Sequence, residues 1–437
     1  MADYATLKKD GESLFKDGKY AECAATYEQI AVEYAEQWNS DEWGHWYYLR
    51  ALRKVNRSAD GVEVGKAFRQ LNANSSRING QYSWCLYDVY MKNPDQENST
   101  NFFKAANKVV EITQQEEYSP YEWIVFCVVD HLQAANNPSY EQIIHWLDKL
   151  DPAKLSSEAQ HGSTAETQNE SYASARERWY GVQTKALIEV KRYDDCITTC
   201  TQALADLDEF HYDNDVWFRW RRALAYLNVD QPEQALPDLK QVLKVKKDSF
   251  VEHAYARALF ALGDNQQALA HAVTSALAAG KVEFKWKLFM LMTRILQALG
   301  ETNYAGQHAL LARQAREMSN PSKDSPELQA LLNELQVDVS SAPPASQLVS
   351  QLRTVWQSFN IAPETVHQGI IDRVHDNGKS GNITNDNGGY HFFGTRSFKG
   401  ASDKMRAGQR VGFNLEEVIN RKTNAAELHA VDIFPAS

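Results

Sequence analysis

Apolar residues recur at helical spacing through the first three quarters of the chain, where strand-like alternation is almost absent and Ala, Leu, Gln and Glu are abundant. The pattern changes at Val366. From there apolar residues alternate with polar ones among Gly and Asn, as in GYHFFG and RVGFNLEEV. The sequence therefore predicts a long helical part followed by a small β domain.

Two polar stretches interrupt the helical pattern. Residues 151–175 are rich in Ser, Gln and Glu and predict a partly disordered insert. Residues 319–365 include NPSKDSPE and SSAPPAS and predict a linker with short helices at Glu327–Leu335 and Ser346–Phe359. We expect five segments, which are 1–150, 151–175, 176–318, 319–365 and 366–437.

The helical part contains internal repeats. Small and apolar residues recur after steps of 33 and 37 positions. The first step takes Ala223, Tyr226, Ala235 and Leu239 to Ala256, Leu259, Ala268 and Ala272, and the second takes Gly263, Ala268 and Ala272 to Gly300, Ala305 and Ala309. Small residues at such spacing allow two helices to cross closely, while bulky ones fill the space between successive pairs.

This pattern resembles the tetratricopeptide repeat. The spacing of that family is present at Leu7, Gly11, Leu14, Gly18, Tyr20, Cys23 and Tyr27, and again at Tyr180, Leu187, Tyr193, Cys196 and Cys200. Residues 176–318 fit four repeats, whereas 1–150 is partly degenerate, with a poor match between Trp43 and Leu150. The resemblance implies a right-handed helical-hairpin solenoid. We expect a mainly α fold in which a small five-stranded all-β barrel follows this solenoid.

The resemblance also implies a concave groove that binds a protein partner or peptide. Its inward positions carry cations and aromatic rings, which attract carboxylates, phosphates and apolar side chains. The candidate groove residues are Arg178, Lys185, Trp217, Trp220, His253, Arg257, Lys287 and Arg294. The alternative is that they are solvated inner-face charges and packing residues between repeats.

Residues 366–437 resemble a cold-shock domain, a barrel of the oligonucleotide-binding type. Gly369, Gly381 and Ile383 match positions in the first two strands of that family, Ser397–Glu417 follows its G-F-K-x-L-x-x-G-Q pattern, and AAELHAV matches its closing strand. The resemblance implies contact with RNA or single-stranded DNA.

The barrel departs from that family at the stacking positions. Arg373 replaces the expected Trp, and Ser380 and Asn382 replace two aromatics, while either Phe392 or His391 is the exposed ring of the third strand. The candidate nucleic-acid-binding residues are Arg373, His375, Lys379, Tyr390, His391, Phe392, Arg396, Lys399, Lys404 and Arg406. The alternatives are a barrel that packs on a protein or on the helical array of its own chain.

Composition and charge limit which cellular compartment and which class of partner we expect. With 46 Lys and Arg against 57 Asp and Glu the net charge is −11, which excludes an overall basic coat but not a local basic surface. The N-terminus has no apolar signal core, no apolar run reaches the about 18 residues of a membrane span, and the five cysteines are scattered. We expect a cytoplasmic protein with reduced thiols and no membrane contact.

No motif for catalysis stands out. Gly378-Lys379-Ser380 lacks the earlier Gly of a phosphate-binding loop, and Cys196 and Cys200 lack a second ligand pair, so both sets are interpreted as structural. We therefore expect no cofactor, no metal and no enzyme activity. The prediction is an adaptor, suited to RNA metabolism, stress response or antiphage defence. It joins a protein partner to nucleic acid and is a possible homodimer. The alternative is a pure protein–protein scaffold.

Overall fold

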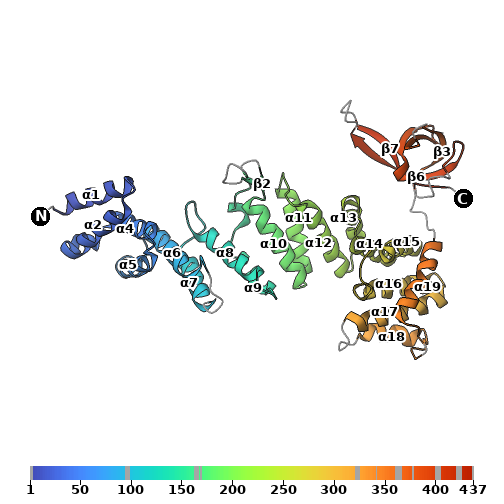
Figure 1. Cartoon of the computed structure of the whole chain (residues 1–437), viewed down its shortest axis with the longest axis horizontal. Helices are drawn as coiled ribbons and strands as arrows, with labels where there is room; N and C mark the ends of the chain where they lie inside the picture. The colour runs from blue at the N-terminus through green and yellow to red at the C-terminus, as the bar shows by residue number, and fades with distance from the viewer. Residues whose placement is uncertain are drawn as a thin grey trace. The chain divides into compact units, whose positions relative to one another are not determined.

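The structure is a computed structural model that describes residues 3–93, 99–161, 167, 170–319, 325–340, 342–359, 367–375, 378–398, 405–419 and 426–435. The chain divides into two compact units, Met1–Arg221 and Arg222–Ser437. Helix pairs dominate the first unit, and the second combines further helices with a β-barrel (Figure 1). The fold is thus a mainly helical, tetratricopeptide-like solenoid followed by a five-stranded barrel.

Consecutive helices pack in pairs along each unit. Those of the first unit are α1 (Tyr4–Lys16), α2 (Tyr20–Glu33), α3 (Ala35–Trp38), α4 (Glu42–Lys54), α5 (Ser58–Leu71), α6 (Ser76–Tyr90), α7 (Ser99–Ile112), α8 (Tyr121–Gln133), α9 (Tyr140–Leu147), η2 (Pro152–Lys154), α10 (Ala175–Glu189) and α11 (Tyr193–Asp206). The unit boundary falls within α12 (Asn214–Asn228). Those of the second unit are α13 (Pro232–Val245), α14 (Ser249–Ala261), α15 (Asn265–Leu277), η3 (Val282–Lys285), α16 (Trp286–Ala298), α17 (Thr302–Ser319), α18 (Pro326–Glu334) and α19 (Ala345–Ser358).

The same type of turn joins the two helices in each of six pairs. Its central residue has a positive φ, and the next backbone N–H donates to a carbonyl five residues earlier, which is the Schellman arrangement. The central residues are Gly18, Asn56, Lys191, Asp230, Gly263 and Gly300, with φ values from 58° to 82°. The N–H···O distances of these turns, for example Lys19 to Leu14 and Glu301 to Leu296, are 2.8–3.0 Å. Asp230, Gly263 and Gly300 are separated by 33 and 37 residues, the steps found in the sequence.

Small residues allow neighbouring helices to approach closely, both within a pair and between successive pairs. A Cβ on Gly11 of α1 would lie 2.9 Å from the Tyr27 ring of α2, and one on Gly65 of α5 would lie 2.6 Å from Tyr82 of α6. Both positions therefore exclude any side chain. The first contact confirms the pairing that the Gly11–Tyr27 spacing predicts.

The last two helices, α18 and α19, form a packed end of the helical array. Helices α18 and α19 both pack on α17, and Leu331 and Leu352 are fully buried. The Trp356 ring of α19 lies parallel to Phe289, at 6.1 Å between centroids. These two helices complete the hydrophobic core, because the last pair would otherwise expose its apolar face.

The polar insert contains a short hairpin that the sequence did not predict. Strand β1 (Gln160–His161) pairs antiparallel with β2 (Ser171–Tyr172). Directly after the insert, the Arg176 guanidinium donates to the carbonyls of Pro152, Ala153 and Leu155 at 2.9–3.0 Å. The beginning of the insert is therefore fastened to the first turn of α10.

The C-terminal strands close into a barrel with the order β3-β4-β5-β7-β6. The strands are β3 (His367–Val374), β4 (Ser380–Asn385), β5 (Tyr390–Gly394), β6 (Arg410–Ile419) and β7 (Ala426–Pro435), with η4 (Thr395–Ser397) after β5. All neighbours are antiparallel except β5 and β7, which are parallel. Alternate residues such as Ile371, Phe393 and Phe413 fill the interior. Among the helices of the described ranges, none is long and apolar enough to cross a bilayer.

The turn geometry predicts the effect of exchanging its central residue. Lys191 has a φ of 63°. The Lys191→Gly variant removes about 1–2 kcal/mol of left-handed strain, offset by about 0.4–1 kcal/mol of greater freedom in the unfolded chain. We expect urea unfolding followed by circular dichroism to show a gain of about 0.5–1 kcal/mol. The Gly263→Ala control, at a φ of 82°, should lose stability; a less stable Lys191→Gly variant would contradict this account.

The buried His308 predicts a dependence of stability on pH. Its Nδ1–H donates to the Tyr304 carbonyl at 2.7 Å, and its Nε2 accepts from Trp356 Nε1–H at 2.8 Å. Burial lowers the pKa of His308 to about 4 from 6.5. The unfolded chain therefore binds the proton first. The contribution of neutral His308 to the free energy of unfolding is therefore complete above about pH 6.5, and it falls by about 3 kcal/mol as the pH drops to about 4.

The measurement is the free energy of unfolding of the full chain at several pH values, compared with that of His308→Asn. The substituted side-chain amide retains a donor for the Tyr304 carbonyl but takes up no proton. The variant should be less stable at neutral pH and should lose less on acidification. Equal slopes in the two proteins would refute the role of His308.

Candidate functional site

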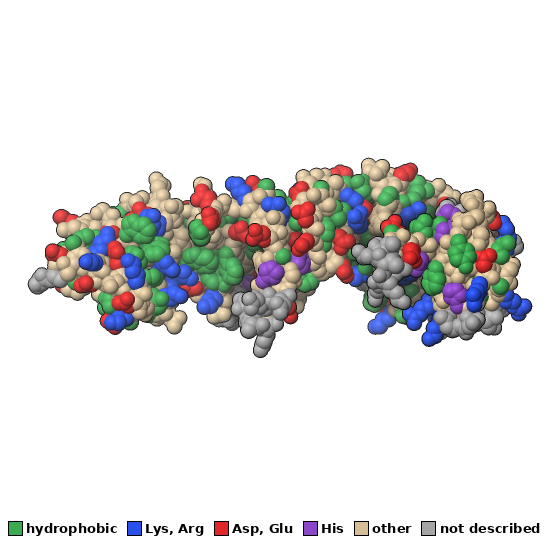
Figure 2. Space-filling view, turned by 90° about the horizontal axis from the view of Figure 1, so that it is seen from above, with side chains coloured by type: hydrophobic (Ala, Val, Ile, Leu, Met, Phe, Trp, Pro, Cys, Tyr) green, Lys and Arg blue, Asp and Glu red, His purple; other side chains and the backbone are tan. Residues whose placement is uncertain are grey.

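Cations and aromatic rings alternate across neighbouring helices of the first unit. The Arg50 guanidinium lies 4.4 Å from the centroid of Trp46 on α4, and that of Arg53 lies 5.3 Å from Trp84 on α6. The Trp84 ring is in turn 6.4 Å from Trp123 on α8. We call these five residues the cation–aromatic strip. Figure 2 shows hydrophobic side chains between Lys and Arg side chains over the N-terminal end of this unit, at the left.

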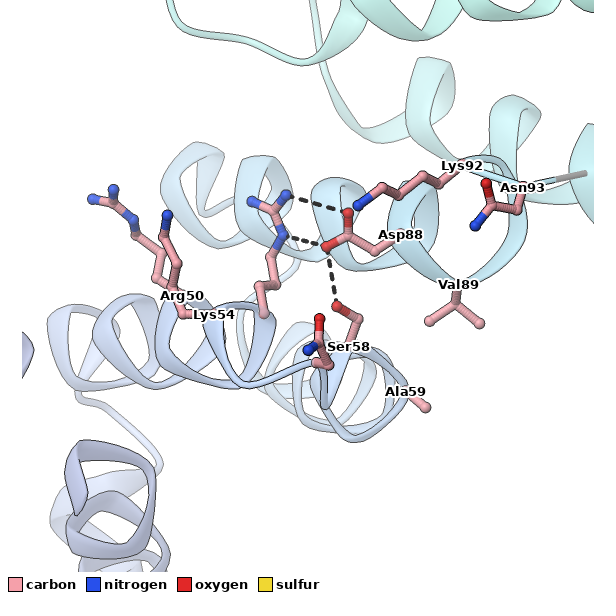
Figure 3. A pocket seen from close by; sticks show the side chains of 10 residues that line it. Arg50, Lys54, Ser58, Ala59, Asp88, Val89, Lys92 and Asn93 are labelled. Atoms are coloured by element: carbon pink, nitrogen blue, oxygen red, sulfur yellow. Dashed lines mark hydrogen bonds and ion pairs between the residues drawn. The ribbon is translucent and has the colours of Figure 1, made fainter. Parts of the chain in front are cut away.

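A pocket of about 600 Å³ adjoins the strip where α4, α5 and α6 meet. Among the residues that the structure describes, its walls include four cations, Arg50, Arg53, Lys54 and Lys92, and one carboxylate, Asp88. Figure 3 shows Arg50 and Lys54 next to one another on one wall, with Asp88 and Lys92 on the other. The lining is therefore strongly positive although the whole chain is acidic.

The one carboxylate of the pocket is already neutralised. Asp88 accepts from Arg53 Nε at 2.7 Å and from the buried Ser58 hydroxyl at 3.0 Å. Arg53 and Asp88 thus form a fixed pair between α4 and α6. The charges of Arg50, Lys54 and Lys92 are the surplus, and they give the pocket a potential that favours anions.

The groove residues predicted in the first unit lie on α10 and α12. The Arg178 guanidinium lies 4.4 Å from the Phe126 ring of α8 and pairs with Asp130. Lys185 is exposed, and Trp217 and Trp220 are half-buried. Arg178 therefore extends the alternation of cations and rings from α8 to α10.

The groove residues predicted in the second unit hold several internal contacts. Arg257 donates to the Leu227 carbonyl at 2.7 Å, and Arg294 pairs with Glu334 of α18 at 2.8 Å. Burial, with smaller effects from Arg257 and Lys287, lowers the pKa of His253 to about 4. The neutral ring is the stable form near neutral pH, so His253 adds no positive charge there.

On the barrel, one outer row crosses four strands. Arg373 pairs with Asn382, Asn382 with Phe392, and Phe392 with His429. The Phe392 ring is 38% exposed and lies 6.1 Å from His375 and 5.0 Å from His429. We call Arg373, His375, Asn382, Phe392 and His429 the barrel face.

The structure settles the register of β5 in favour of Phe392. His391 points inward, is 8% exposed, and has its ring 6.1 Å from Phe413, so it is no candidate for stacking on a base. The prediction failed at this residue because strand alternation alone left two registers open. Lys379, Tyr390, Arg396 and Arg406 are exposed, and Lys399 and Lys404 lie outside the described residues.

The two neighbouring cysteines of α11 lie in the helical core. Cys196 and Cys200 are fully buried, with their sulfurs 3.9 Å apart, and the Cys196 thiol faces the Thr184 carbonyl at 3.7 Å. The contact with the Cys200 sulfur lowers the pKa of the Cys196 thiol. In the described part of the chain, no group of three or more His, Cys, Asp or Glu residues is placed to hold a metal ion.

The pocket at α4 and α6 was not predicted from the sequence. Its residues belong to the region between Trp43 and Leu150, which matched the repeat pattern poorly. The signal was present, since Arg50, Arg53 and Lys54 follow an aromatic run in HWYYLRALRK. Asp88 and Lys92 are more than thirty residues away in the sequence, and only the packing of α4 against α6 brings them to the same place.

No family model matches the sequence, and no curated protein matches it. Solved structures share its helical architecture at low identity. A tetratricopeptide repeat protein from Parabacteroides merdae is 10% identical, with 76% of this chain and 98% of that chain covered and a TM-score of 0.30. Pseudomonas aeruginosa pilF is 11% identical, with 66% of this chain and 96% of that chain covered and a TM-score of 0.30. The TPR2AB domain of yeast Sti1 in its pHSP90 complex is 10% identical, with 76% of this chain and 98% of that chain covered and a TM-score of 0.26. Scores of this size carry no argument about function.

Proposed function

We propose that the chain is an adaptor whose helical array binds an acidic segment of a protein partner. The observation that carries this proposal is the pocket between α4 and α6, where three surplus cations adjoin exposed aromatic surface. Trp43 and Trp123 of the same unit are 47% and 56% exposed. Cations select carboxylates, and the rings offer apolar contact to the side chains between them.

A segment of a protein fits this surface better than a small anion does. The strip runs over α4, α6 and α8, so that a ligand in extended conformation can contact rings and cations together. A pocket of about 600 Å³ holds only one or two side chains of such a segment. The rest of the affinity would come from the strip, because exposed ion pairs contribute only about 0–1 kcal/mol each.

The first test is binding of a short fluorescein-labelled peptide rich in Glu and Leu, followed by anisotropy between about 50 and 300 mM salt. The Arg50→Glu/Lys54→Glu variant should bind about tenfold more weakly, because attraction becomes repulsion. The matched control is Lys66→Glu/Lys104→Glu, which makes the same change of charge at exposed residues of α5 and α7. Absence of binding to the wild-type chain, or equal affinity in the pocket variant, would refute the acidic-segment proposal.

A second function is proposed for the barrel, which is contact with RNA or single-stranded DNA. Support comes from the parallel β5–β7 pair within the closed order β3-β4-β5-β7-β6, an arrangement compatible with the oligonucleotide-binding type. Further support is the exposed Phe392 ring, with Arg373 in the same cross-strand row. Residues 366–437 hold nine Lys or Arg against eight Asp or Glu, so stacking on Phe392 has to contribute alongside the phosphate contacts.

The second test is binding of labelled single-stranded RNA, single-stranded DNA and duplex to the full chain. One stacked base contributes about 1–3 kcal/mol, so Phe392→Ala should weaken single-strand binding by about 5- to 150-fold. The control is Phe284→Ala, which removes another exposed ring, 74% accessible, from η3. Binding that is undetectable in dilute salt, or unchanged in Phe392→Ala, would leave the barrel as part of a protein–protein scaffold.

A further inference from the structure

Three residues of the first unit form a continuous hydrogen-bond chain from a buried carboxylate to an exposed hydroxyl. The Ser171 hydroxyl of β2 lies 2.8 Å from Nε2 of His211. Nδ1 of the same ring lies 2.8 Å from Oε2 of Glu177 on α10. Ser171, His211 and Glu177 thus have the order of a nucleophile, a base and the group that orients the base.

The network fixes the tautomer of the imidazole ring. A carboxylate oxygen only accepts, so Nδ1 carries the proton and donates to Glu177. In the neutral ring Nε2 is then an acceptor, and the Ser171 hydroxyl donates to it. This is the protonation state in which a histidine removes a proton from a serine.

The carboxylate at the inner end of the chain is held by three donors. In addition to His211 Nδ1, Glu177 Oε1 accepts from the His211 backbone N–H at 2.7 Å and from Asn214 Nδ2 at 2.8 Å. The Ser174 side chain caps α10 by accepting from the Glu177 N–H at 3.1 Å. These contacts fix the carboxylate in the first turn of α10, facing the loop before α12.

Burial decreases from the carboxylate to the hydroxyl. The side chain of Glu177 is 1% exposed and that of His211 is 13% exposed, whereas Ser171 is exposed. A buried ion with three donors keeps its geometry because no water competes for it. The nucleophile remains open to a ligand from solvent.

We infer that Ser171 is an activated nucleophile that reacts with exposed acyl esters. Its Oγ forms a bond to the carbonyl carbon while His211 Nε2 takes the hydroxyl proton. The bond to the leaving alcohol then breaks, and the imidazolium returns that proton to the departing oxygen. Water, deprotonated by the same nitrogen, hydrolyses the acyl-serine and restores the free hydroxyl. Glu177 is a positioning residue that stabilises the imidazolium.

This activity is independent of both the pocket and the barrel. No pattern in the sequence indicates it, because Ser171 and His211 are 40 residues apart and match no hydrolase motif. The competing explanation is structural, namely that the three residues only fasten the β1–β2 hairpin to the loop before α12. A structural anchor requires the same hydrogen bonds but no enhanced reactivity.

The experiment is covalent labelling of the full chain with a fluorophosphonate probe, in which Oγ attacks phosphorus and fluoride leaves. We expect peptide mass spectrometry to find the label on Ser171. His211→Gln should slow the labelling by about a hundredfold, the usual contribution of a general base. Ser13→Ala, which removes an exposed hydroxyl of α1, should leave the rate unchanged. Hydrolysis of p-nitrophenyl acetate should be lost in Ser171→Ala.

The effect of Glu177→Gln on labelling separates catalysis from anchoring. This variant should label Ser171 more slowly than the wild-type chain at the same pH, because the imidazolium that forms during the reaction loses a neighbouring negative charge. If Ser171 in the wild-type chain is labelled no faster than other exposed serines, or if His211→Gln leaves its rate unchanged, the inference is wrong and the chain of hydrogen bonds is an anchor. The comparison of Ser171 with other exposed serines uses the wild-type chain alone, so it does not depend on whether a variant folds.

Discussion

The left-handed turn between paired helices is the constraint on which the helical part depends. At each of the six turns, one residue with positive φ reverses the chain while the next N–H closes onto a carbonyl of the first helix. The second helix therefore begins at a fixed position relative to the end of the first. Gly11 and Gly65 complete the geometry by bringing side chains of a neighbouring helix against the backbone. The positions of the side chains on the helix faces therefore depend on the turns and on these close approaches.

This constraint explains how an acidic chain concentrates positive charge at one place. The first helices of neighbouring pairs, α4 and α6, are in contact. The Arg53–Asp88 ion pair lies at that contact, so its energy fastens two pairs together. Arg50 and Lys54, near the C-terminal end of α4, line the same pocket, and Asp88, the carboxylate among its described lining residues, is already held by Arg53. The surplus charge results from helix register and not from composition.

The sequence predicted those elements whose cause is local. Gly18, Gly263 and Gly300 indicate their turns directly because glycine tolerates a positive φ. Asn56, Lys191 and Asp230 adopt the same conformation but carry weaker signals, and the first of them lies in the region that looked degenerate. The packing of α18 and α19 at the end of the array has no local signal in the sequence. Its Pro-rich and Ser-rich connections resemble a linker, while the contact between Trp356 and His308 spans 48 residues. His391 and Phe392 were exchangeable until the pairing of β5 with β7 fixed the register.

The candidate sites share a further property, which is that each lies where the repeat pattern is interrupted. The pocket belongs to the poorly matching helices, Ser171 to the polar insert, and the barrel face to a separate β domain. Positions inside a regular repeat are occupied by small and apolar residues that the crossing of helices requires, as Cys196 and Cys200 show by their complete burial. Glu177 is a polar group in that core, and both of its carboxylate oxygens accept hydrogen bonds. Regular repeats therefore supply a frame, and the pocket, Ser171 and the barrel face occur at its interruptions. Periodicity in the sequence predicts least at those interruptions, because the residues there do not follow the repeat.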